Sequence, residues 1–499
     1  MTFRINSLLI AILFSVNSLF AQQHIEQIIK EGIKQTYNFQ FQQAERTFSD
    51  LIKKYPNDPR GYHYKSTIFL WNFLGNSDKK DFDKFLQYSE QAISLAEKML
   101  KSSANNENAK FIIGSSNGYR AIAFGKAEKY LDMIWASKKS SDHLSDVIEL
   151  NNQNYDAYLG LGLFKFALSK VPSAFKWALS TIGFNGNQDE GLRYINIAAE
   201  KGTFAQVEAR FYLAQIYGEF FNDYDKSSKI LDQLISDFPG NMLFIYTSAV
   251  NDLKERNLNK SERQLLKIVN DKKSGYKQIR SFSNFLLGDI KFRQNKFEEA
   301  KEFYISFLST TSNNDYKGIA YYRLAISHEL LDERLSSKMY FQHCNEGNST
   351  LDDDAYANRK GDVYMERELT ESERSIIRFS NMVEAKNYSA AIDSLKSLFD
   401  ELENISLKAE TAYWLSESYL GLNQYNESID YSNFAITAKQ NSEKWIAPFA
   451  NYNLGIAYQG LNNFKKSIEF LDKAASFSNY DYESKLKSLI SGARIKKDS

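Results

Sequence analysis

The sequence has a single cysteine, Cys344, and only five prolines among its 499 residues. One cysteine excludes a disulfide within the chain, so the fold must be stable without covalent crosslinks. Few prolines permit many long helices, because proline interrupts a helix interior. Lysine plus arginine (62) equals aspartate plus glutamate (62), which leaves no global field to attract nucleic acid or an anionic membrane. We therefore expect a large helical protein with no nucleic-acid partner.

Residue patterns for metal, nucleotide or acid–base chemistry are also missing. The five histidines never fall at the HxH or HExxH spacings that bring two imidazoles to one metal ion. No G-x-x-x-x-G-K-[ST] phosphate loop occurs, and the pair Gly160 and Gly162 lacks the third glycine of a dinucleotide-binding loop. The sequence thus predicts no catalytic residue, no metal and no cofactor.

A recurring spacing of small and larger apolar residues dominates what is present. Its fullest copy contains Gly455, Tyr458, Leu471 and Ala474. The small residue allows two antiparallel helices to approach closely, and the larger residues fill the seam between them. One such pair cannot bury its apolar face alone, so neighbouring pairs must stack. Residues equivalent to Gly455 recur as Ala214, Gly288, Ala325 and Ser416.

This pattern resembles the tetratricopeptide repeat superfamily, whose usual unit is about 34 residues. Gly288 and Ala325 lie 37 residues apart here, and Ser416 and Gly455 lie 39 apart, so the turns carry extra residues. The resemblance implies an all-α fold, namely an α-α superhelix of stacked antiparallel helix pairs.

In tetratricopeptide repeats the residue three before the small anchor usually faces the binding groove. The resemblance therefore implies a partner-binding role for five aromatic residues, Phe211, Phe285, Tyr322, Tyr413 and Tyr452. Rigid aromatic faces suit the binding of extended or helical peptide segments. The alternative is that these rings pack against the next repeat. The residues directly after the anchors include no lysine or arginine, so we do not expect a clamp for a partner's terminal carboxylate.

The chain divides into four parts on this pattern. Residues 1–21 have the features of a signal peptide, and residues 22–346 form an N-terminal repeat array with an insertion at about 168–187. Residues 347–370 form a polar break with a connecting helix, and residues 371–499 form a C-terminal array with a capping helix.

A second resemblance, to a single family, rests on the stretch from Gly160 to Leu192. Its sequence is GLGLFKFALSKVPSAFKWALSTIGFNGNQDEGL. It is similar to a stretch of the tetratricopeptide repeat 39 family and of related bacterial helical-repeat proteins, and the similarity covers roughly residues 119–220. It implies the same helical-repeat fold.

Residues 1–21 show the order of parts found in a secretory signal. Arg4 supplies the positive start, Leu8 to Val16 the apolar run, and Ala21 a small residue before the cut. The apolar run is shorter than the roughly 20 residues of a membrane-spanning helix. The composition resembles that of exported Bacteroidetes proteins, so we expect cleavage after Ala21 and a periplasmic location. The alternative is a membrane anchor formed by the uncleaved leader.

Three short motifs have both a chemical and a structural interpretation. Gly114-Ser115-Ser116-Asn117-Gly118 matches the G-x-S-x-G motif of hydrolases, but the surrounding strand and helix pattern is missing and two glycines four residues apart favour close helix packing. Cys344 is interpreted as a small buried filler. Asp352-Asp353-Asp354 could attract a hard cation, yet the glycine and later glutamate of a calcium loop are missing, so we expect a solvated break.

These observations together predict a non-catalytic scaffold or adaptor that binds protein or peptide segments, with association with an envelope complex as one option. The alternative function is a periplasmic binding protein for a lipid or an apolar small molecule held inside the superhelix.

Overall fold

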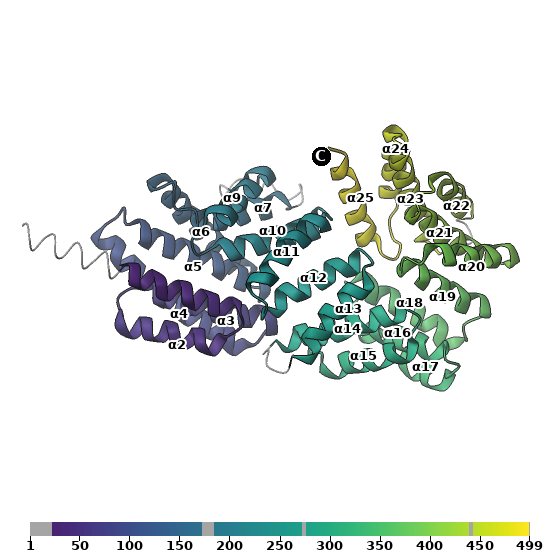
Figure 1. Ribbon diagram of the computed structural model, residues 1–499, viewed down its shortest axis with the longest axis horizontal. Helices are drawn as coiled ribbons and strands as arrows, with labels where there is room; N and C mark the ends of the chain where they lie inside the picture. Colours follow the sequence, from purple (N-terminus) through teal and green to yellow (C-terminus); the bar gives the residue numbers. More distant parts are fainter. Residues whose placement is uncertain (1–21, 172–183, 272–275, 439–442, 499) are drawn as a thin grey trace, which may run out of the picture. The chain divides into compact units, whose positions relative to one another are not determined.

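The computed structural model describes residues 22–171, 184–271, 276–438 and 443–498; for residues 495–498 only the backbone is described. Within these ranges every regular element is a helix and no β-strand occurs (Figure 1). The predicted all-α fold is confirmed. No helix in the described ranges combines the length and the apolar character needed to cross a membrane. The predicted leader and most of the predicted insertion lie outside the described residues.

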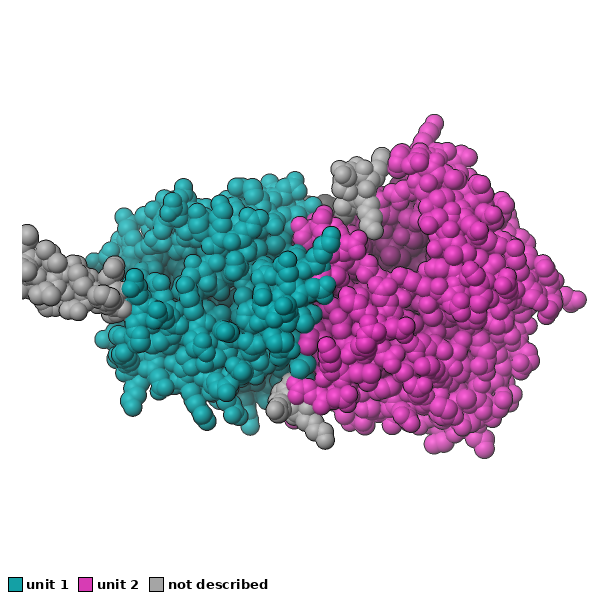
Figure 2. Space-filling model, viewed as in Figure 1, with its two compact units in different colours: residues 1–215, 229–244, 273–276 teal, residues 216–228, 245–272, 277–499 magenta. Residues whose placement is uncertain are grey.

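The chain forms two compact units, which Figure 2 shows in different colours. Unit 1 comprises residues 1–215, 229–244 and 273–276, and unit 2 comprises residues 216–228, 245–272 and 277–499.

The helices of unit 1 are residues 22–37, α2 (Phe41–Lys54), α3 (Pro59–Asn76), α4 (Lys79–Ser102), α5 (Glu107–Lys126), α6 (Tyr130–Leu150), α7 (Ala157–Ser169) and α9 (Gln188–Lys201). Three helices contribute residues to both units: α10 (Gln206–Phe220), α11 (Tyr224–Asp237) and α12 (Met242–Lys254).

Unit 2 continues with α13 (Leu258–Asn270), α14 (Lys277–Arg293), α15 (Phe297–Thr310), α16 (Lys317–Glu329), α17 (Arg334–Phe341), the short 3-10 helix η1 (Cys344–Glu346) and α18 (Asp352–Glu366). It ends with α19 (Glu371–Glu384), α20 (Tyr388–Glu401), α21 (Ile405–Gly421), α22 (Tyr425–Thr437), α23 (Ile446–Gly460), α24 (Phe464–Ala475) and α25 (Glu483–Asp498).

One type of turn joins the two helices in pair after pair. The residue two positions before the second helix has a left-handed backbone, with φ of 57° at Asn295, 57° at Asn423 and 58° at Asn462. Asparagine tolerates this conformation better than most residues. Repetition of one turn explains why successive pairs have the same antiparallel arrangement. Equivalent residues with positive φ are Phe39, Ser77, Glu128, Asn222, Arg256, Asp332 and Lys386.

The small residues of the repeat occupy the seam within each pair, as the sequence predicts. A Cβ atom added at Gly455 on α23 would come within 2.8 Å of Leu471 on α24. Leu471 and Ala474 are almost completely buried. The seam therefore has no room for a larger side chain at position 455.

The carboxylate cluster at the start of α18 differs from the expected solvated break. Asp354 is only 1% exposed. Its carboxylate accepts hydrogen bonds from the backbone N–H groups of Tyr316, Ile319 and Asn348, at 2.8, 2.9 and 2.8 Å. The expectation is wrong for Asp354 because this carboxylate satisfies the donors at the start of α16, a role with no signal in the local sequence.

Candidate interaction surface

The five aromatic residues with a predicted partner-binding role lie on α10, α14, α16, α21 and α23, each the first helix of a pair. Four of them are buried: Phe211 is 3% exposed, Phe285 6%, Tyr322 8% and Tyr413 6%. Tyr452 alone is partly exposed. This placement favours the packing interpretation for the four buried rings.

Ring contacts show what these side chains pack against. Phe285 lies 5.3 Å from Phe307 between ring centroids, and Tyr413 lies 5.0 Å from Trp445 on the next pair. Tyr413 and Tyr452 belong to one apolar cluster of unit 2, and Phe285 and Tyr322 belong to another. Phe211 lies in a cluster of unit 1. The structure therefore brings the five residues together as two pairs and one separate ring.

The first helices of unit 2 also have a side that faces away from their second helices, and we call this side the inner face. α14, α16, α21 and α23 pack on α15, α17, α22 and α24 with the opposite side. Side chains of α14, α16, α19 and α21, together with Arg256 of the turn before α13, form one chain of ion pairs, which we call the charged network. Its members are Arg256, Asp289, Arg293, Arg323, Glu384 and Glu417.

The charged network joins helices from several pairs. Arg256, in the turn before α13, contacts Glu384 of α19 at 2.8 Å and Glu417 of α21 at 3.0 Å. Arg293 of α14 contacts the same Glu384 at 2.8 Å. Arg293 also contacts Asp289 at 2.7 Å, and Asp289 contacts Arg323 of α16. The network therefore stabilises the placement of α14, α16, α19 and α21 relative to one another.

Electrostatics show that the network is balanced. Burial alone would raise the pKa of Glu384, but the guanidinium groups of Arg256 and Arg293 outweigh burial and hold this pKa at about 2. Three guanidinium groups face three carboxylates, and the side chains of Arg256 and Glu384 remain 23% and 22% exposed. The network thus has no surplus of positive charge, and its Arg256–Glu384 pair is partly accessible to water.

A second group of charges surrounds α18. Arg359 contacts Glu443 at 2.7 Å and Asp481 at 2.6 Å, and Lys360 contacts Glu443 at 3.1 Å. Burial raises the pKa of Glu410 on α21 to about 7, and the ammonium group of Lys360 offsets only part of this effect. Glu410 is therefore a carboxyl group that titrates near neutral pH.

In unit 1 a carboxylate lies among tyrosine rings instead. Glu208 on α10 is 2% exposed and accepts a hydrogen bond of 2.6 Å from the hydroxyl of Tyr119. Burial raises the pKa of Glu208 from an ordinary 4.5 to about 7, while hydrogen bonds from Tyr119 and Tyr37 oppose the rise. No sequence motif marks this residue, because its environment comes from helices distant in the sequence.

The serine of the G-x-S-x-G motif lies in the same unit, inside α5. Ser116 is 1% exposed, and its hydroxyl lies 2.8 Å from Nδ1 of His63, which is also 1% exposed. Burial lowers the pKa of His63 to about 3, so the ring is neutral at physiological pH. A serine next to a histidine is the starting geometry for nucleophilic catalysis. Here both side chains are buried within helical packing, so a substrate cannot reach the hydroxyl in this conformation.

The glycines of this motif pack against α6, as the sequence predicts. A Cβ atom at Gly114 would come within 2.7 Å of Leu144, and one at Gly118 within 3.0 Å of Ser140.

Cys344 is 2% exposed, which confirms it as a buried filler, and burial raises the pKa of its thiol. Among the described residues no group of three or more His, Cys, Asp or Glu side chains is arranged to hold a metal ion.

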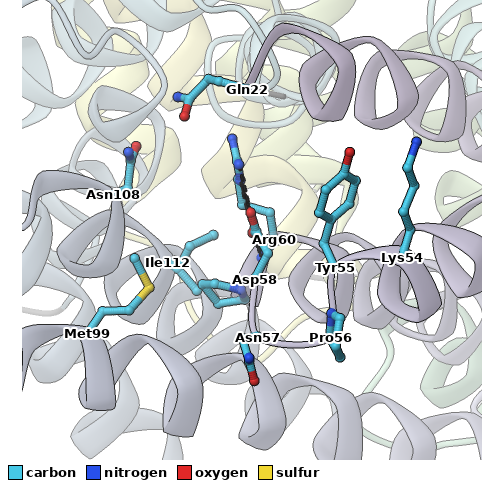
Figure 3. Close-up of a pocket in the computed structure, with 11 residues that line it drawn as sticks. Gln22, Lys54, Tyr55, Pro56, Asn57, Asp58, Arg60, Met99, Asn108 and Ile112 are labelled. Atoms are coloured by element: carbon cyan, nitrogen blue, oxygen red, sulfur yellow. Dashed lines mark hydrogen bonds and ion pairs between the residues drawn. The ribbon is translucent and has the colours of Figure 1, made fainter. Parts of the chain in front are cut away.

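A shallow pocket of about 540 Å³ opens at the start of α3 in unit 1 (Figure 3). Asp58 caps α3 by accepting from the backbone N–H of Arg60 at 3.0 Å, and its carboxylate also binds the Arg60 guanidinium at 2.7 Å. Lys54, Tyr55 and Asn108 line the pocket as well. Pro56, Met99 and Ile112 add apolar surface, so the lining is of mixed character.

Comparison with known families agrees with this architecture. Residues 154–346 match the family described as Iml2/Tetratricopeptide repeat protein 39. Residues 450–480, which include the Gly455 copy, match the tetratricopeptide repeat itself. The two matches support the assignment of the chain to the tetratricopeptide repeat superfamily and confirm the resemblance. No curated protein sequence matches the chain.

The chain also matches solved structures. The P58(IPK) TPR domain is 13% identical, with 84% of this chain and 96% of that chain covered and a TM-score of 0.22. Yeast Tom70 is 11% identical, with 96% and 97% covered and a TM-score of 0.22. The human IFIT1 dimer with PPP-AAAA is 14% identical, with 83% and 94% covered and a TM-score of 0.33.

Proposed function

We propose that this chain is an exported, non-catalytic scaffold that binds protein or peptide segments on the inner face of unit 2. The observation that supports the proposal most is the partly exposed inner face itself, where Tyr452 and the charged network lie on successive helix pairs of a tetratricopeptide repeat protein. Aromatic and paired polar side chains on adjacent helices offer contact area together with orientation-dependent hydrogen bonding.

The absence of catalysis is part of the same proposal. The serine and histidine that lie closest to a catalytic arrangement, Ser116 and His63, are each 1% exposed. Nδ1 of the neutral His63 imidazole lies 2.8 Å from the Ser116 hydroxyl, and Nε2 lies 3.5 Å from the hydroxyl of Ser115. A structural role in linking α3 to α5 accounts for both contacts.

The test of the scaffold function compares two tyrosines on one helix. Tyr452 lies on the inner face. Tyr458, also on α23, instead stacks on Phe470 of α24 at 5.4 Å between ring centroids. We expect Tyr452→Ala to reduce recovery of crosslinked partner proteins from the cell envelope, and Tyr458→Ala to leave recovery unchanged. Equal recovery with both variants, at unchanged helix content by circular dichroism, would count against the proposal.

The periplasmic location is proposed from the leader. Its test is amino-terminal sequencing of the chain recovered from the periplasmic fraction, where Gln22 is the expected first residue. Recovery of the chain only in the membrane fraction, with residues 1–21 intact, would favour the uncleaved anchor instead.

A further inference from the structure

The C-terminal helix α25 does more in unit 2 than cap the last helix pair. A simple cap contacts only the pair that precedes it. α25 lies beside α23 and α24 (Figure 1), but it and the residues just before it also contact α18 and the turn between α10 and α11. Contacts with such distant repeats mean that this segment joins α23 and α24 to α18 and to the turn before α11 within unit 2.

The first half of this segment, residues 481–485, contacts α18. The carboxylate of Asp481 lies 2.6 Å from the guanidinium of Arg359. The ring of Tyr482 lies 5.2 Å from the ring of Tyr356. The backbone N–H of Lys485 donates to the Asp352 carboxylate at 3.2 Å.

The second half is anchored elsewhere in unit 2. Asn222 donates from its side chain to the backbone carbonyl of Ser488 at 3.2 Å, across 266 positions of sequence. Gly492 lies so close to this asparagine that an added Cβ atom would come within 2.6 Å of it. Gln459 of α23 donates to the carbonyl of Ala493 at 3.4 Å.

The apolar contacts of α25 follow the pattern of a bound amphipathic helix. Leu486, Ile490 and Ala493 are 0%, 3% and 6% exposed and join the cluster that contains Tyr413. Their spacing of four and three residues places them on one side of the helix. Lys487, Ser491 and Arg494 on the other side are exposed.

We propose that α25 occupies in cis the surface on which unit 2 receives an amphipathic helix of a partner protein, and that such a helix binds by displacing α25. The partner helix has apolar residues at the spacing of Leu486, Ile490 and Ala493, preceded by an acidic residue that pairs with Arg359. Figure 2 shows unit 2 hollowed on the face turned to the viewer. This inference rests on the proposed scaffold function and names the chemistry of its partner.

The direct test uses the full chain with a protease site in place of residues 476–478, between α24 and α25. The probe is a fluorescent synthetic peptide of residues 479–494, and its binding is followed by anisotropy. We expect the cleaved chain to bind the peptide at least about tenfold more tightly than the uncleaved chain. A control peptide with Leu486→Asp and Ile490→Asp should not bind either form.

Two results would overturn the inference in this assay. Equal binding by cleaved and uncleaved chains would place the peptide at a different surface. Absence of binding by a cleaved chain that retains its helix content would show that α25 does not exchange. Dimers of the uncleaved chain formed by exchange of α25 would assign the surface to a second copy of this chain and also overturn the partner proposal.

If the cleaved chain unfolds, amide hydrogen exchange measured on the unmodified chain tests the same inference. Amides of α25 should exchange at least about tenfold faster than those of α23, because detachment of α25 does not require the repeats to open. Equal protection of both helices would contradict the inference. Equal protection of both helices, together with reduced partner recovery in Tyr452→Ala, would contradict this inference but not the proposed scaffold function.

Discussion

The buried carboxyl group of Glu208 makes a quantitative prediction about stability and pH. Its pKa is about 7 in the folded chain against an ordinary 4.5, because burial disfavours the charged form more than the tyrosine hydroxyls favour it. The folded state therefore holds the proton more tightly than the unfolded state. This contribution to stability is fully present at low pH and is lost as pH rises from 4.5 through 7.

Replacement of Glu208 by glutamine removes the ionisation and keeps the size of the side chain. From the difference of the two pKa values, ionisation opposes folding by about 1 kcal/mol at about pH 5.5 and by about 3 kcal/mol at about pH 8.5. The stability of Glu208→Gln relative to the native chain should thus rise by about 2 kcal/mol between these two conditions. Changes in the hydrogen bonds to Tyr119 and Tyr37 add an offset that does not vary with pH.

The assay is urea unfolding followed by far-ultraviolet circular dichroism at both pH values, for the native chain and the variant. Glu200→Gln, at an exposed position of α9, controls for the general loss of one negative charge. Other titrating groups change the free energy of unfolding equally in the native chain and in the variant. Their contributions therefore cancel when the two free energies are subtracted. A difference between Glu208→Gln and native chain that stays constant across this range would refute the reasoning.

Three further outcomes follow from the packing and the ion pairs. Gly455→Val should lower the free energy of unfolding by about 1–3 kcal/mol in urea titrations, because the seam with α24 has no room for its methyl groups. Ser116→Ala should lower it by about 1–3 kcal/mol, because it removes the hydroxyl that lies 2.8 Å from Nδ1 of the buried His63. Loss of an esterase activity in this variant would contradict a non-catalytic chain. Glu384→Gln should be about 1–3 kcal/mol less stable at neutral pH, with a smaller loss of stability between about pH 5 and pH 2 than the native chain shows.

The helix pairs were predictable from the sequence because their determinants are local. The small residue at Gly455 and the apolar residues at Leu471 and Ala474 define a seam between helices that are adjacent in sequence. The spacing of apolar residues along the chain therefore predicts these contacts. The roles of the glycines at 114 and 118 were predictable for the same reason, since they lie four residues apart on one helix.

The interaction surface was harder to predict because its contacts join distant repeats. Asp289 and Glu417 stand directly after two small anchors and are visible in the sequence, but their arginine partners are not. Arg256 comes from a turn, and Arg323 comes from another pair. Nor does local sequence pattern report a bond between Asn222 and Ser488, which are 266 positions apart. The groove role implied for the buried aromatic residues could not be separated from packing, because both need a large ring at one helix position.

Two carboxyl groups, Glu384 and Glu208, respond to acid and base in opposite ways because their neighbours differ. Glu384 in unit 2 has two guanidinium neighbours and a pKa of about 2, so its contribution to stability is present above an ordinary 4.5 and is lost as pH falls towards 2. Glu208 in unit 1 has only hydroxyl partners, so its contribution is lost as pH rises towards 7. The guanidinium neighbours of Glu384 favour its charged form, whereas burial of Glu208 among hydroxyl groups disfavours the charged form. Removal of the charge at Glu384 should therefore lower the stability at neutral pH, whereas removal of the charge at Glu208 eliminates a penalty that grows as pH rises.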